Sequence, residues 1–116
     1  MENWIKSLEN RIQELEEERE KIVREMSELK PLIGCIEYKY VLNKIGKKYY
    51  YFYLRRLVDG KLRSIYLGKS IPEGLIKARE DRYRLKVLKE QLKKIERQIR
   101  SIERILRKNV RENKDF

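Results

Sequence analysis

Lysine, arginine and tyrosine are the side chains of this 116-residue chain that could do chemistry, and they concentrate in one segment. Residues 31–71 contain nine Lys or Arg, two Asp or Glu, and seven of the eight tyrosines. Cationic side chains bind phosphates, and aromatic side chains can stack on bases. A basic and aromatic segment is therefore typical of a surface that binds nucleic acid.

The residue types that many enzymes use are absent or isolated. The chain has no histidine and a single cysteine, Cys35, which excludes histidine acid–base catalysis, His/Cys zinc sites and an internal disulfide. A thiol without a histidine or second cysteine indicates a small buried residue, here at a junction between a helix and a sheet. We therefore expect a protein that is not an enzyme and that uses no metal, cofactor or small-molecule substrate.

The overall composition indicates one folded domain, residues 1–116, with a highly charged surface. Thirty Lys and Arg against nineteen Asp and Glu give a formal net charge of +11, and 41% of the residues are hydrophobic. A disordered chain would lack that apolar fraction. The apolar runs are only a few residues long, and the N-terminus lacks the pattern of a secretory signal. We expect a cytoplasmic protein that does not bind membranes.

Two long helices are expected, one on each side of the basic segment. Residues 1–30, ended by Pro31, and residues 72–110 carry heptad patterns, with Arg19 as the one polar seam position and residues 111–116 as a frayed tail. Such seams predict an antiparallel coiled coil, formed within one chain or between two, and a homodimer in either case. The seam positions are Ile5, Leu8, Ile12, Leu15, Arg19, Ile22, Met26 and Leu29 in the first helix, and Leu85, Leu88, Leu92, Ile95, Ile99, Ile102 and Leu106 in the second.

Residues 35–69 predict a three-stranded antiparallel meander, with strands at about residues 36–42, 48–57 and 61–67. Asp59-Gly60 predicts a type I′ hairpin, and residues 43–46 predict a type I turn closed by a left-handed glycine. The Asp59-Gly60 turn is expected to pair Leu54 with Ile65 and Phe52 with Leu67. The predicted fold class is therefore α+β: a long helix, a three-stranded antiparallel β-meander and a second long helix, with the helices in a coiled coil.

This register gives the sheet two unlike faces. An apolar face is expected to pack on another element, and it carries Ile36, Tyr38, Tyr40, Leu42, Tyr50, Phe52, Leu54, Ile65 and Leu67. The opposite face carries Glu37, Lys39, Val41, Tyr49, Tyr51, Tyr53, Arg55, Leu62, Ser64 and Tyr66.

The same segment resembles the arm-type DNA-binding domain of phage-integrase tyrosine recombinases. The resemblance covers residues 46–80 and lies in the aromatic run after Gly46-Lys47, the Asp59-Gly60 turn with its basic continuation, and Leu67-Gly68-Lys69. It implies a sheet that sits in the DNA major groove, and a source in a virus or mobile element, since small uncharacterised mobile-element proteins carry a similar pattern. The long helices are foreign to the recombinases and no catalytic domain fits, so recombinase activity is not implied.

Ten residues are the expected nucleic-acid-binding residues, with duplex DNA as the partner. Arg or Lys can read guanine edges in the major groove, and Lys and Tyr can hold phosphates. One group is expected to share the less apolar face: Lys39, Tyr51, Tyr53, Arg55 and Tyr66. The other group is expected at the hairpin tips and edges: Lys47, Lys48, Arg56, Lys61 and Arg63.

Other interpretations stay open at this point. Aromatic residues also favour strands and pack across them, so the chain could be a structural coiled-coil protein that binds another protein. Stacked tyrosines could instead bind RNA or single strands. The basic residues of the second helix could form a stripe that contacts phosphate, or, near the interface, could offset the acidic first helix, which cannot balance all of them. The abundance of Lys, Glu, Arg and Ile, with no Thr and a single Ala, further predicts a thermophilic source.

Overall fold

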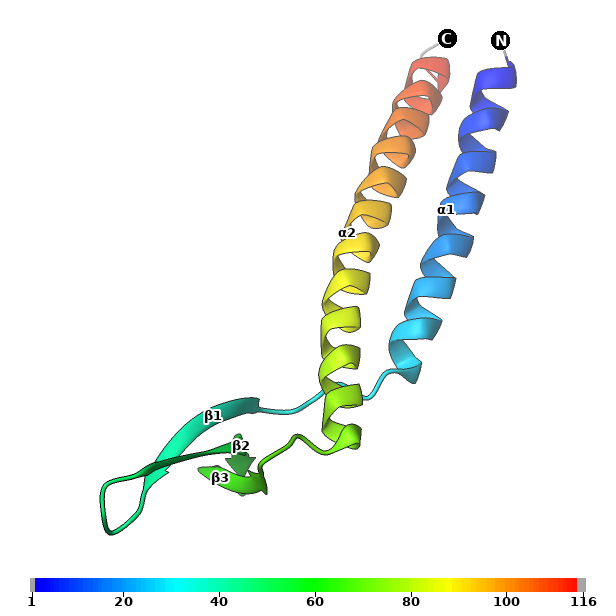
Figure 1. Cartoon of the computed structure of the whole chain (residues 1–116). Coiled ribbons are helices and arrows are strands. Elements are labelled where there is room, and N and C mark those ends of the chain that lie inside the picture. Colours follow the sequence, from blue (N-terminus) through cyan, green and yellow to red (C-terminus); the bar gives the residue numbers. More distant parts are fainter. Residues whose placement is uncertain (1, 115–116) are drawn as a thin grey trace. The chain divides into compact units, whose positions relative to one another are not determined.

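The computed structural model describes residues 2–114, with side chains described for residues 3–109. Its elements in chain order are helix α1 (Glu2–Glu28), strands β1 (Cys35–Leu42), β2 (Lys48–Val58) and β3 (Lys61–Gly68), and helix α2 (Glu73–Lys114) (Figure 1). The predicted α+β order is therefore confirmed. The chain forms two compact units, one made of α1 with α2 from Leu85 onward and the other of residues 30–84.

In the helical unit, α1 and α2 lie side by side and run antiparallel (Figure 1). Leu15 of α1 and Ile95 and Ile99 of α2 form a buried cluster, against which Ile22 and Ile102 pack. All fifteen predicted seam positions are buried or half-buried, including the polar Arg19. The heptad spacing therefore predicted the buried stripe of both helices, which contact each other in this chain.

The helix ends differ slightly from the expected ones. α1 ends at Glu28, two residues before the predicted end. α2 begins at Glu73, directly after Pro72, whose carbonyl accepts a hydrogen bond from the Ile76 N–H at 3.1 Å. It continues to Lys114, and residues 115 and 116 of the predicted tail lie outside the described residues. Within residues 2–114, neither helix contains an apolar stretch long enough to cross a bilayer.

The strands of the second unit are joined by the two predicted turns. In the first, the Gly46 N–H donates to the Asn43 carbonyl at 3.1 Å, and Gly46 has a positive φ of 81°. In the second, Asp59 and Gly60 have φ values of 52° and 78°, and two consecutive positive φ angles are the signature of a type I′ turn. Both turns connect neighbouring antiparallel strands in the order β1-β2-β3.

The register of the sheet agrees with the prediction except at one end of β3. Leu54 lies opposite Ile65, as predicted, but Phe52 lies opposite Gly68 and not opposite Leu67. A bulge next to Phe52 causes the difference, because it adds one residue to β3 and leaves Leu67 without a directly opposed partner. The pairing predicted between Phe52 and Leu67 was therefore wrong.

The two predicted faces of the sheet are present, but the apolar face is covered over only part of its length. Leu54 is 4% exposed, and its neighbours Ile36 and Ile65 are half-buried. The expectation that the whole face packs on another element was wrong, because four of its residues are exposed at or beyond the end of β3. These residues are Tyr38, Tyr40, Leu42 and Tyr50.

Cys35 is exposed, which contradicts the expected burial of its thiol. It is the first residue of β1 and lies opposite Arg55, so the alternation of side chains along the strand places it on the less apolar face. The position at the start of the sheet was predicted, but the side of the sheet was not.

Candidate nucleic-acid interface

The pairing of the strands places five of the predicted binding residues on one face of the sheet. Along β1 and β2 the odd-numbered residues point to this side, since Lys39 lies opposite Tyr51. On β3 the even-numbered residues do so, since Tyr53 lies opposite Tyr66. We call this the reader face, and its polar and aromatic members are Glu37, Lys39, Tyr51, Tyr53, Arg55, Ser64 and Tyr66.

The centre of the reader face is a contact cluster of one lysine and three tyrosines. The Lys39 Nζ atom lies 4.6 Å from the centroid of the Tyr53 ring and 3.4 Å from the Ser64 Oγ atom. The Tyr66 ring meets the rings of Tyr51 and Tyr53 edge-on, with centroids 5.5 and 5.7 Å apart. The tyrosines therefore do pack across strands, while Tyr66 remains 59% exposed and available to a ligand.

Glu37 is the one acidic residue in the sequences of the three strands, and it lies within the reader face. Its carboxylate is 3.5 Å from the Lys39 ammonium and 3.4 Å from the Arg55 guanidinium. A phosphate or base that binds Lys39 and Arg55 must therefore compete with Glu37. The sequence analysis did not predict that Glu37 pairs with these two cations. Two signals could have shown the pairing: Glu37 lies two residues before Lys39 on the same strand, and the register of the first hairpin brings it near Arg55.

The other five predicted residues are not brought together on the reader face. Lys47 lies at the end of the first turn, Lys48 lies opposite Leu42, and Lys61 lies opposite Val58 next to the second turn. Arg56 and Arg63 lie directly opposite each other on the other side of the sheet, the face that also carries Leu54. Like charges opposed across strands repel, and among the described residues neither arginine has a carboxylate partner. The structure thus places these cations at the tips and on the opposite face.

A hollow of about 440 Å³ lies at the start of β1 and carries a cation that the sequence reasoning missed. Arg55, Arg56 and Arg82 all line it, and the Arg82 guanidinium donates a hydrogen bond to the Gly34 carbonyl. Gly34 has a φ of 100°, and a Cβ atom there would lie 2.3 Å from the Arg55 carbonyl oxygen. The Gly34 backbone thus packs directly against β2 at Arg55 and Arg56, and only a glycine leaves room for this contact.

Asp81 ties the segment before β1 to the beginning of α2. Its carboxylate accepts the Lys30 N–H at 3.1 Å and pairs with the Lys77 ammonium at 3.0 Å, while the residue is only 8% exposed. The Lys30 N–H and then the Lys77 side chain lower the pKa of Asp81, and the hydrogen bond and charge of Asp81 raise the pKa of Lys77. The Leu32 N–H adds a bond to the Ala78 carbonyl at 2.9 Å. These contacts position the strand that carries Lys39.

Residues 5–75 match the model of a protein family, DUF6788, a domain of unknown function. The chain belongs to the DUF6788 family. The matched region extends from α1 through the whole sheet to the first turn of α2, and it includes all ten predicted binding residues. No curated protein and no solved structure matches the chain. The resemblance of residues 46–80 to the integrase arm-type domain stays a prediction.

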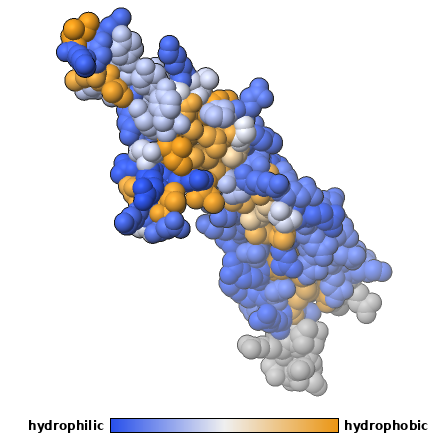
Figure 2. All heavy atoms as spheres, turned by 90° about the horizontal axis from the view of Figure 1, so that it is seen from below, coloured by the Kyte–Doolittle hydropathy of each residue, from blue (hydrophilic) through white to orange (hydrophobic). Residues whose placement is uncertain are grey.

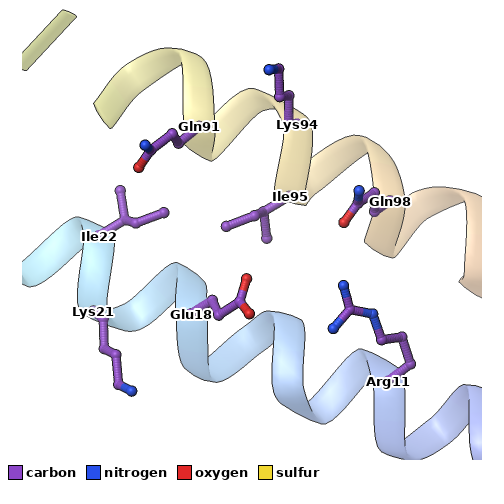
Figure 3. A pocket seen from close by; sticks show the side chains of 8 residues that line it. All are labelled: Arg11, Glu18, Lys21, Ile22, Gln91, Lys94, Ile95 and Gln98. Carbon is purple, nitrogen blue, oxygen red and sulfur yellow. The ribbon is translucent and has the colours of Figure 1, made fainter. Parts of the chain in front are cut away.

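The helical unit of this DUF6788 protein has a second concave surface, a groove of about 460 Å³ between α1 and α2. In Figure 3, Ile22 and Ile95 point toward each other across it, whereas Lys21 and Lys94 point away. The remaining residues that line the groove are polar: Arg11, Glu18, Gln91 and Gln98. An apolar centre with polar margins suits a further amphipathic helix.

Proposed function

We propose that this chain is a DNA-binding protein without enzymatic activity, which contacts duplex DNA through the reader face and the basic hairpin tips. The observation that carries the proposal is the reader face itself. One uncovered side of a sheet brings together Lys39, Arg55 and an exposed Tyr66, in a segment with nine cations against two anions. Solubility alone does not require so uneven a balance.

The chemistry of this face fits a duplex in the following way. A β-ribbon can enter the major groove, where Arg or Lys can donate to guanine edges. Arg55 and Lys39 are the donors on the reader face, and the tyrosine hydroxyls can bond to phosphates. Lys47, Lys48 and Lys61 lie near the turns, where passing phosphates would neutralise them. Arg56 and Arg63, which oppose each other without a carboxylate, would gain from any phosphate that lies between them.

Fluorescence anisotropy with a labelled duplex tests the proposal at two salt concentrations. The wild-type chain should bind with an affinity that falls steeply as salt rises. The double variant Lys39→Gln/Arg55→Gln should weaken binding by roughly tenfold or more, because it removes two cations from the reader face. A matched control is Arg97→Ala/Arg100→Ala, which removes two arginines from the middle of α2 and should have a much smaller effect.

Each other result has a defined meaning. If Lys39→Gln/Arg55→Gln binds the duplex as the wild type does and the α2 control loses affinity, the reader face is not the DNA contact. Helix α2 would then be the DNA-binding element. Stronger binding to single strands or to RNA than to the duplex overturns duplex recognition in favour of base stacking on tyrosines. No binding to any nucleic acid, with a protein partner retained at high salt, favours the structural coiled-coil alternative.

We further propose that the chain is a homodimer in which the coiled coil is the dimeriser or a spacer. The groove between α1 and α2 supports this, because pairing of two such hairpins would cover the half-buried Ile22 more completely. α1 is acidic and α2 is basic, so helices of two copies are also complementary in charge. Light scattering that gives a monomer mass at micromolar concentration would overturn the dimer.

The predictions of a mobile-element source and of a thermophilic source rest on the sequence alone.

A further inference from the structure

The first hairpin extends beyond the third strand of the sheet. β3 pairs with β2 only from Phe52 to Val58, so, among the described residues, residues 48–51 of β2 pair with β1 alone. Together with their partners and the turn, they form a two-stranded segment, residues 39–51, which we call the arm. Four residues of strand correspond to about 14 Å of length, to which the turn adds. The arm is at the left of Figure 1.

The arm is unusually rich in cations and aromatic rings. Its thirteen residues include four lysines, four tyrosines and no acidic residue. The Lys48 Nζ atom lies 4.6 Å from the centre of the Tyr40 ring, and the Lys47 Nζ atom lies 5.4 Å from that of Tyr49. Among the residues that the structure describes, Lys44, Lys47 and Lys48 form no ion pair with a carboxylate. The arm thus presents unneutralised positive charge on both sides of a ribbon.

The tip of the arm is apolar in spite of this charge. Ile45 is 87% exposed, and the nearby Val41 and Leu42 are 48% and 56% exposed. The turn that carries Ile45 is well held, because the Asn43 Oδ1 atom accepts the N–H groups of Ile45 at 3.0 Å and Lys47 at 2.9 Å. In Figure 2, which keeps the hairpin at the left, orange atoms lie among blue ones at that end. A hydrogen-bonded turn therefore holds a branched apolar side chain out into solvent.

We propose that the tip of the arm reaches the minor groove next to the major groove that the reader face enters, and that Ile45 inserts between two base pairs there, so that the DNA bends. This inference rests on the proposed function. Apolar wedges of this kind partly unstack a base step and kink the duplex, while cations on either side hold the phosphates. Charge complementarity selects the partner, since Lys44, Lys47 and Lys48, which form no ion pair with a described carboxylate, fit the two phosphate strands that flank a groove.

The inference can be tested on the full-length chain by measuring DNA bending. The probe is a duplex of about 30 base pairs with a flexible TA step at its centre and a dye at each end, and energy transfer between the dyes reports the bend. Saturating wild-type protein should bring the ends together and raise the transfer efficiency. Ile45→Ser should lose that rise at saturation and weaken binding by roughly three- to tenfold. Ile45→Met keeps an apolar wedge and should still bend the DNA. Ile33→Ser is the matched control, because Ile33 is 74% exposed and lies outside the arm.

The outcomes separate this inference from the proposed function. If the wild-type chain does not bind the duplex at all, both are overturned. If it binds but leaves the duplex straight, or if Ile45→Ser bends it as the wild type does, only the arm's role is overturned. A third result would also overturn the arm's role on DNA. The wild-type chain would bind vesicles that contain phosphatidylserine and leave a bound duplex straight, and Ile45→Ser would lose the vesicle binding, so that Ile45 would be assigned to a membrane.

Discussion

The guanidinium of Arg55 lies 3.4 Å from the carboxylate of Glu37 on the reader face. The same carboxylate lies 3.5 Å from the ammonium of Lys39, so one acidic side chain partly neutralises both expected base-reading cations. Glu37→Gln should therefore strengthen duplex binding. Exposed ion pairs contribute about 0–1 kcal/mol, which corresponds to an increase in affinity of up to roughly fivefold. Anisotropy titration at low salt measures the effect.

The control for this prediction is a chemically equal change elsewhere. Glu90 is an exposed residue of α2 that pairs with Lys93 at 3.5 Å, so Glu90→Gln removes the same charge from the helical unit. If the reader face contacts DNA, Glu37→Gln should change the affinity more than Glu90→Gln does. Equal effects would show that only net charge matters, and weaker binding in Glu37→Gln would mean that Glu37 helps to orient Arg55.

Gly34→Ala is expected to destabilise the sheet unit. Gly34 has a φ of 100°, and a Cβ atom would lie 2.3 Å from the Arg55 carbonyl oxygen and 2.7 Å from the Arg56 Cβ atom. Backbone strain alone costs on the order of 1–3 kcal/mol, and the collision with β2 adds to it. Gly46→Ala is the matched control, since Gly46 has a φ of 81° but open space around it. Chemical denaturation should show the larger loss for Gly34→Ala, and equal losses would contradict the close approach.

Much of the fold followed from patterns that are local in the sequence. The heptads predicted the seam because a helical stripe depends only on spacing, and Arg19 took its seam position although it is polar. Asp59-Gly60 predicted the second turn because two positive φ angles favour these residue types. Once the turns were placed, alternation along the strands assigned Lys39, Tyr53 and Tyr66 to one face.

The features that the sequence did not predict depend on neighbours that are distant in the chain. The pairing of Phe52 with Gly68 depends on a bulge that alternation cannot indicate. The exposure of Tyr38 depends on where β3 stops, and the role of Arg82 depends on the approach of Gly34 to β2. Asp81 meets Lys30 across fifty-one residues of sequence, and no periodicity predicts that contact.

The contacts of Asp81 predict a stability that depends on pH. The Lys30 N–H and the Lys77 side chain lower its pKa from 3.8 in the folded chain. The charged carboxylate therefore stabilises the fold above about pH 4, and this stabilisation is lost as the pH falls through the lowered pKa. Asp81→Ala should lower the melting temperature at neutral pH, and the difference from the wild type should shrink as the pH falls through the lowered pKa of Asp81. Circular dichroism at several pH values measures both.

Lys77→Gln separates the two partners of Asp81. It removes the exposed end of the ion pair but leaves the bond from the Lys30 N–H in place. Lys77→Gln should therefore lower the melting temperature less than Asp81→Ala does at neutral pH. Equal losses would show that the Lys30 bond contributes little, and a constant deficit for Asp81→Ala at every pH would contradict a role for the charge.

Leu15 is the residue of α1 on which the coiled coil depends most, because it is 1% exposed and lies in one cluster with Ile95 and Ile99. Leu15→Ala leaves a cavity there and should cost about 2–5 kcal/mol of unfolding free energy. Leu62→Ala is the matched control, since Leu62 lies in β3 and is 54% exposed, and surface substitutions usually stay within about 0.5 kcal/mol. Urea denaturation followed by far-ultraviolet circular dichroism measures both variants. A Leu15→Ala chain as stable as Leu62→Ala would mean that α1 does not pack on α2 in solution.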